Sequence, residues 1–88
     1  MRTLYLSDLH TAACALRLLP DTERAAALQA AIKNAKNADR HRKRLHKAHP
    51  VFGTGTLASA FGPVTEPHHC DAAYLAALAV VLEALRDC

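Results

Sequence analysis

The sequence predicts an all-α protein: a small bundle of three main helices and one short helix in a single domain spanning residues 1–88. Three observations favour this class. The chain is 51% apolar, with much of that alanine, and only 5% aromatic, and alanine favours helices whereas strands favour aromatic residues. Apolar residues recur at helical spacing. The breaks between these segments fall at proline or glycine, which end helices.

The first main helix is expected over about residues 8–19. Ser7 is a good N-cap, and Asp8 then lies favourably in the first turn. Pro20 stops the helix. Residues 2–6 are expected to be extended and to pack Leu4 or Leu6 on the body. The apolar positions with helical spacing are Leu9, Ala12, Ala13, Leu16 and Leu19.

The second helix is long, over about residues 22–48, with Asp21 or Thr22 as its cap. It ends before the His49-Pro50 step, because a residue before proline disfavours helical geometry. Its first half carries the core stripe, and its second half keeps few apolar residues. We therefore expect the second half to extend over or beyond the body. The stripe consists of Leu28, Ala31, Ile32 and Ala35, followed by Ala38, Leu45 and Ala48.

The last two helices follow a glycine-bearing connection in which Phe52 can dock on the core. Thr56 caps a short helix over 57–61, which Gly62 and Pro63 close. Asp71 caps the last helix, about 72–86, which carries no charge from residue 72 to 82. A helix that is apolar nearly all round is central to a fold or forms a subunit interface. We expect the last helix to be buried.

The most informative feature is a basic segment in the second helix. Residues 33–47 hold seven bases and one acid, a local charge of +6, whereas the whole chain is +3 and the remainder therefore −3. Most of these bases share one helix face. Such a surface attracts polyanions and acidic protein surfaces. The predicted binding residues are Lys33, Lys36, Arg40, Lys43, Arg44 and Lys47.

A solvated helix face is the alternative interpretation of this segment. A purely solvating face normally mixes positive and negative residues. This run lacks interleaved Glu, so we expect no i, i+4 ion pairs to relieve its self-repulsion. Binding is therefore the favoured hypothesis, and a face that serves only solubility is the other.

Three further motifs are weaker. Gly53-Thr54-Gly55-Thr56 lacks the lysine and the preceding strand of a phosphate-binding loop, and is interpreted as turn glycines with an N-cap. His68-His69-Cys70 lacks the paired spacing of a zinc site, even if His46 and His49 add ligands. Cys70 with His68 or His69 lacks an orienting group for catalysis. We expect no enzyme activity, no metal, no cofactor and no small-molecule substrate.

Location follows from what the chain lacks. No apolar run approaches 20 residues, so no membrane span is expected. The N-terminal residues lack the apolar core of a signal peptide. Three cysteines, including Cys14 among apolar neighbours, are an odd number and do not suggest a disulfide framework. We expect a cytoplasmic protein that has no membrane partner and that associates with assembling particles.

Several segments together resemble a known family. They are 6–9, 38–42, 49–57, Asp71, 74–75 and 78–85. The resemblance is to short uncharacterised proteins encoded in the head-gene cluster of alphaproteobacterial gene transfer agents, which are phage-like particles that package host DNA. That family typically has Trp where this chain has Phe52, and an acidic loop where this chain has His68-His69-Cys70.

The resemblance implies a non-enzymatic accessory role in head assembly or DNA packaging, and it supplies no functional residues. With the basic face, the expected partners are a DNA backbone or an acidic protein of the head or packaging machinery. The alternative is a protein–protein adaptor that forms homo-oligomers through apolar surfaces, with a basic face that gives only solubility.

Overall fold

The computed structural model of the chain describes residues 1–49, 53–65 and 71–86. These residues contain four α-helices and no β-strand. The predicted all-α class is therefore confirmed. The helices are α1 (Leu6–Leu16), α2 (Asp21–Leu45), α3 (Leu57–Phe61) and α4 (Ala72–Arg86).

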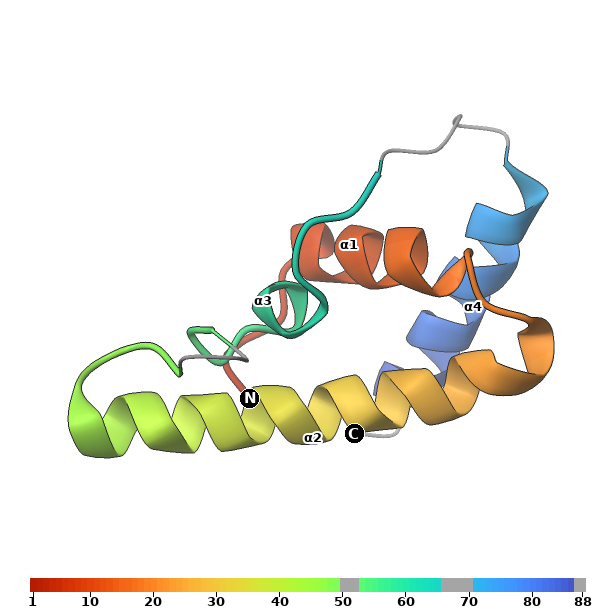
Figure 1. Cartoon of the computed structure of the whole chain (residues 1–88). Coiled ribbons are helices and arrows are strands. Elements are labelled where there is room, and N and C mark those ends of the chain that lie inside the picture. Colours follow the sequence, from red (N-terminus) through yellow and green to blue (C-terminus); the bar gives the residue numbers. More distant parts are fainter. Residues whose placement is uncertain (50–52, 66–70, 87–88) are drawn as a thin grey trace.

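The long helix α2 forms one side of the molecule, and α1, α3 and α4 together form the other side (Figure 1). α1 packs mainly against α4 and α3, whereas α2 packs mainly against α3 and α4. At about 1.5 Å per residue, the 25 residues of α2 extend for about 37 Å. This helix therefore sets most of the 41 Å length of the molecule.

The core lies where the four helices meet. Each helix contributes one large, fully buried side chain: Leu16, Leu28, Leu57 and Val81. The spaces between them are filled largely by small residues, namely Ala12, Ala13, Ala31 and Ala77. Small side chains allow helices to approach closely, so the alanine-rich composition gives a thin but continuous core.

The first helix begins earlier than expected and is not capped by Ser7. α1 starts at Leu6, which places Asp8 in its first turn. The Asp8 carboxylate accepts hydrogen bonds from the backbone N–H of Tyr5 (2.9 Å) and of Ala58 (3.1 Å). Asp8 thus satisfies a free N–H at the start of α1 and also ties that end to α3. Ahead of the helix, Leu4 packs against the core, whereas Leu6 is exposed.

The first helix also ends earlier than expected, at Leu16. The buried guanidinium of Arg24, from the second turn of α2, occupies the space beyond its end. Its Nε donates to the carbonyl oxygens of Leu16 and Leu19, each 3.1 Å away. Carbonyls at a helix end lack partners within the helix, so Arg24 supplies them.

The second helix differs from the expectation at both ends. It begins at Asp21 without a side-chain cap, and it ends at Leu45 instead of near residue 48. The next residue, His46, has a φ of 58° in the left-handed region, and its N–H bonds to the Arg42 carbonyl (2.8 Å). A left-handed residue ends a helix and turns the chain.

The caps of the later helices agree with the sequence. The Thr56 hydroxyl accepts the Ser59 N–H at 3.1 Å at the start of α3. The Asp71 carboxylate accepts the N–H groups of Ala73 (2.8 Å) and Tyr74 (3.3 Å) at the start of α4. Phe52, which was expected to dock on the core, lies outside the described residues.

The last helix is buried on one face only, which corrects the expectation of a buried helix. Ala77 and Val81 are fully buried, but Leu75 and Leu82 are about half exposed, at 53% and 49%. α4 is held to α1 by polar contacts as well. The Arg17 guanidinium donates to Asp71 at 3.0 Å, and His10 Nδ1 lies 2.8 Å from the Tyr74 hydroxyl.

None of the helices in the described residues combines the length and apolar character that a membrane span requires.

Candidate nucleic-acid interface

The candidate interface is the outer face of α2. All six residues predicted to bind, Lys33, Lys36, Arg40, Lys43, Arg44 and Lys47, are exposed. The first four turns of α2 bury Leu28, Ile32 and Ala35 against the body, and the bases project from the opposite side. Their common exposure therefore follows from the register in which the apolar stripe is buried.

Four of these bases form what we call the basic face: Lys33, Lys36, Arg40 and Arg44. Each has an exposed side chain, and none makes an ion pair among the described residues. The steps between them are three, four and four residues, so they follow one side of the helix. Since no acid among the described residues offsets them, their charge is available to a partner.

Lys43 differs from these four because it forms an ion pair with Asp39. Its Nζ lies 3.3 Å from the Asp39 carboxylate at an i, i+4 spacing, and Arg42 donates to the same carboxylate at 2.9 Å. The expectation that the segment makes no i, i+4 ion pair is therefore wrong. One acid is enough here, since its carboxylate accepts two neighbouring cations at once.

Asp39 can serve both cations because it is held in place. It is only 5% exposed, and the Met1 amino group also lies 3.6 Å from its carboxylate. The hydrogen bond from Arg42 is the main reason that the pKa of Asp39 lies below its ordinary value, with Lys43 adding to it. The carboxylate is thus kept ionised as a fixed counter-charge on one flank of α2.

Gly55 explains how the chain covers this flank. Its φ is 95°, which residues with a side chain rarely adopt, and a Cβ atom there would lie 2.7 Å from Asp39 Cα. The Gly55 carbonyl also accepts the N–H of Arg2 at 2.9 Å. Glycine is required because two backbones meet at this point. The connection of Gly53 to Thr56 is therefore a packing element, and no phosphate-binding loop is needed to explain it.

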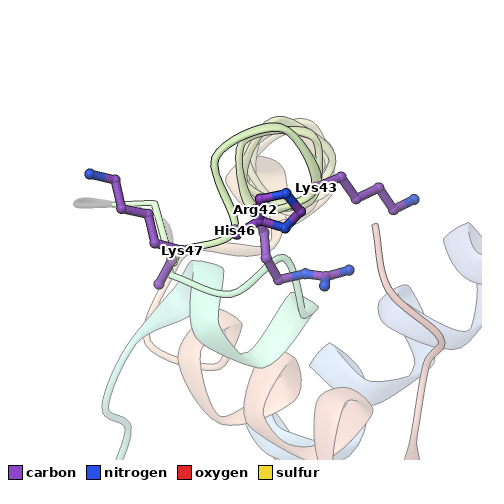
Figure 2. A pocket seen from close by; sticks show the side chains of 5 residues that line it. Arg42, Lys43, His46 and Lys47 are labelled. Carbon is purple, nitrogen blue, oxygen red and sulfur yellow. The ribbon is translucent and has the colours of Figure 1, made fainter.

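Lys47 does not continue the basic face. It follows the left-handed turn at His46 and lies beyond the end of α2. Figure 2 shows its side chain on the opposite side of the helix end from Lys43. A common face for Lys43 and Lys47 assumed that the helix continued to residue 48, and that assumption fails at His46.

Two hollows flank the end of α2. The larger, of about 580 Å³, is lined by Arg42, Lys43, His46, Lys47 and Ala48. Figure 2 shows that its charged side chains spread in different directions, so they do not converge on one point. Two of its four charged or titratable groups, Arg42 and Lys43, are already bound to Asp39.

The smaller hollow, of about 230 Å³, lies on the other flank and is lined by five polar residues: Asn37, Arg40, His41, Arg44 and His49. The rings of His41 and His49 meet edge to face, with centroids 4.9 Å apart. Burial lowers the pKa of His41 below its ordinary value, and the positive charges of His49, Lys47 and Arg44 lower it further. Positive charge therefore accumulates on this flank.

Asn37, His41 and His49 were not among the residues predicted to bind. The sequence does show helical spacing for Asn37, Arg40, His41 and Arg44, and this spacing could have indicated that they share one side of α2. The contribution of His49 was not visible, since it depends on the turn that folds the chain back after α2.

Comparison with protein families assigns the chain to one family. A model for a domain of unknown function, DUF7742, matches residues 2–85. The chain belongs to the DUF7742 family. No curated protein and no solved structure matches it. The DUF7742 match spans the first three helices, all but the last residue of α4, and the whole basic face. Because the function of this family is unknown, a connection with gene transfer agents stays a proposal.

The structure describes the remaining polar motifs of this DUF7742 domain only in part. His68, His69 and Cys70 lie outside the described residues. Within the ranges that are described, no three His, Cys, Asp or Glu side chains are grouped so that they could hold a metal ion. Cys14 is buried on α1, with its sulfur 3.5 Å from His10 Nε2.

Proposed function

We propose that this protein is a non-enzymatic accessory protein of a phage-like head-assembly or DNA-packaging system, of the gene transfer agent type. In this role its basic face contacts a nucleic-acid backbone or an acidic protein partner. The particle context is supported by the resemblance in the sequence. The contact itself is supported by the structure of α2.

One observation carries the binding proposal: the four residues of the basic face are exposed, aligned and unpaired among the described residues. Repulsion between neighbouring cations disfavours such an arrangement in a free protein. A bound polyanion offsets that repulsion. The counterions condensed on the polyanion are released at the same time, which also favours binding. The arrangement is therefore more favourable in a complex than alone.

The partner that suits this face best is duplex DNA, bound independently of its base sequence. The basic face is a row of long cationic side chains on a helix, and charged contacts to phosphates carry no sequence information. We expect weak binding with a strong dependence on salt. If about four phosphates are neutralised, log K against log salt has a slope of roughly −3.6.

A fluorescence anisotropy titration with duplex DNA at several salt concentrations tests this. The informative variant replaces Lys33, Lys36 and Arg40 with Gln, which changes the net charge by −3. Its matched control replaces Ala26, Gln29 and Ala30 with Glu. These three residues are also exposed on α2, and the replacements also change the net charge by −3. For the Gln variant, we expect the slope of log K against log salt to be shallower than that of the parent by about three. For the control, we expect the slope of the parent.

The second candidate is a protein–protein module that forms oligomers, with a basic face that serves only solubility. The exposed apolar side chains of α4 favour it, since Leu75 and Leu82 are about half exposed. A hollow of about 520 Å³ also lies against α4, lined by Ala25, Ala79, Val80, Glu83 and Ala84. Exposed apolar patches of this kind are typical of interaction surfaces.

Co-purification from particle-producing cells separates the candidates. A partner that is lost after nuclease treatment indicates binding through nucleic acid. A partner that survives nuclease but is lost from the Gln variant indicates an acidic protein. Binding that is insensitive to both points to the apolar surface of α4.

A further inference from the structure

We propose that the smaller hollow beside α2 binds one phosphate group of a nucleic-acid backbone. The inference rests on the proposed function and names the chemical group that the interface recognises. The hollow is the one lined by Asn37, Arg40, His41, Arg44 and His49. We call it the phosphate pocket.

The donors of the pocket come from two parts of the chain. Asn37, Arg40 and Arg44 lie three and four residues apart on α2, so their side chains are neighbours on the helix. His49 comes from the segment after the helix. Its backbone makes two hydrogen bonds with Gly53, at 2.7 and 3.1 Å, which fix the position of His49. The pocket thus has a helical wall and a second wall supported by its own hydrogen bonds.

His41 gives the pocket a ring nitrogen that no described residue uses. Its Nε2 atom is buried and has no hydrogen-bond partner among the described residues. A buried polar atom without a partner is costly, and a bound oxyanion removes that cost when Nε2 carries the proton of the ring and donates it in a hydrogen bond. The charged or titratable neighbours that face it are cationic or can become so: Arg40, Arg44, Lys47 and His49.

None of the described residues that line the pocket carries a carboxylate. Asp39, the acid of this segment, is engaged by Arg42 and Lys43 instead. Among the described residues, Arg40 and Arg44 therefore make no ion pair. An anion that binds there meets two guanidinium groups, an amide and an imidazole.

These donors suit a phosphate better than a carboxylate. A guanidinium is a planar fork that binds two oxygens of one anion, and a single fork saturates a carboxylate. Two forks with two further donors suit a tetrahedral anion, whose oxygens point in different directions. The pocket therefore favours a phosphate of a nucleic acid over the side chain of an acidic protein.

The direct test follows the imidazole signals of His41 and His49 by NMR while inorganic phosphate is added. Sodium acetate at the same pH and ionic strength is the control for a carboxylate. We expect phosphate to shift both rings in a saturable manner and to raise the pKa of His41, because an anion stabilises the protonated ring. We expect acetate to produce little change.

Two variants test whether DNA uses the same pocket. Arg44→Lys keeps the charge but removes the fork, and should weaken duplex binding about tenfold. Asn37→Asp places a carboxylate in the pocket. Its matched control is Asn34→Asp, which makes the same charge change one turn earlier on α2, outside the pocket. We expect Asn37→Asp to weaken DNA binding about tenfold more than Asn34→Asp.

The outcomes separate this inference from the proposed function. DNA binding that is equal in the two Asp variants, with equal ring shifts in phosphate and acetate, overturns the pocket and leaves the basic face in place. A saturable shift specific to phosphate, in a protein that does not bind DNA, supports the pocket as a phosphate site and overturns the proposed DNA contact.

Discussion

Arg24 caps a helix to which it does not belong: its Nε lies 3.1 Å from the carbonyl oxygen of Leu16, at the end of α1. The side chain is only 6% exposed. It also binds the carbonyl of Leu19, at 3.1 Å, and the carboxylate of Asp21. One guanidinium therefore closes the turn between α1 and α2.

Replacing Arg24 with Met should destabilise the protein by about 2–3 kcal/mol, because the Leu19 carbonyl loses its hydrogen bond from the guanidinium and the Leu16 carbonyl keeps only the one from the Leu19 N–H. A domain of this size then melts roughly 10–20 °C lower. Arg40→Met is the control, since Arg40 is exposed on the same helix and should change stability by less than about 0.5 kcal/mol. Thermal unfolding followed by circular dichroism measures both. Equal melting temperatures would show that Arg24 does not stabilise the turn.

Gly55→Ala should cost about 3 kcal/mol, because it combines an unfavourable φ with overlap against a backbone. The new Cβ atom would lie 2.7 Å from Asp39 Cα. Gly62→Ala is a matched control: its φ of 75° is also positive, but nothing lies within 4 Å of the added atom. Its ψ of −163° gives a conformation that is nearly restricted to glycine, so Gly62→Ala should cost about 1–3 kcal/mol from backbone strain alone, without the overlap. Urea unfolding gives the two values, and a Gly62 variant that is the less stable would contradict the close approach at Gly55.

Stability should fall at acidic pH, in part through Asp71. Hydrogen bonds from the backbone of Tyr74 and Ala73, with the charge of Arg17, hold the pKa of Asp71 below its ordinary value. A carboxylate with a lowered pKa stabilises the fold above its unfolded pKa of about 3.9, and that contribution disappears as the pH falls through the folded pKa.

Asp71→Asn should therefore be less stable than the parent at pH 7, where the ion pair with Arg17 is intact. The two proteins should converge as the pH falls below about 4, since the parent then loses its carboxylate too. Melting temperatures measured from pH 7 to pH 2 test this. A difference that stays constant over the range would mean that the charge of Asp71 does not contribute.

Adjacent residues of α4 should respond oppositely to aspartate. Val81→Asp should unfold the protein, because Val81 is fully buried and an unpaired carboxylate there costs several kcal/mol out of a total of about 5–15. Leu82→Asp should leave the helix content unchanged, since Leu82 is 49% exposed.

Sedimentation of the Leu82→Asp variant also tests the second candidate function. If the exposed side of α4 joins copies of the chain, the parent should sediment as an oligomer and this variant as a monomer. A parent that is monomeric at all concentrations would argue against an oligomer formed through α4.

The helices could be predicted because their signals are local. Thr56, Gly62 and Asp71 act at their own helix ends, as their residue types indicate. The apolar spacing in α2 likewise indicated which side is buried, and hence which bases are exposed. These features depend on neighbours within a few residues, which the sequence displays directly.

Other features depend on contacts between distant segments, and these could not be predicted. His46 ends α2 in a left-handed conformation without the glycine that usually marks such a turn. Because α2 ends there, Lys47 does not lie on the basic face. Asp39 was visible as an acid, but its burial depends on Gly55. The phosphate pocket needs His49, which reaches it only through that turn.

The straightness of α2 gives the basic face a fixed footprint. From Lys33 to Arg44 the helix rises about 16 Å, at about 1.5 Å per residue. Duplex DNA rises about 3.4 Å per base pair, so a basic face that lies along it would contact roughly five base pairs, or half a helical turn, and the 41 Å molecule would cover about twelve. A long duplex then has room for many copies side by side, and saturation should occur at a mass of protein exceeding that of the DNA.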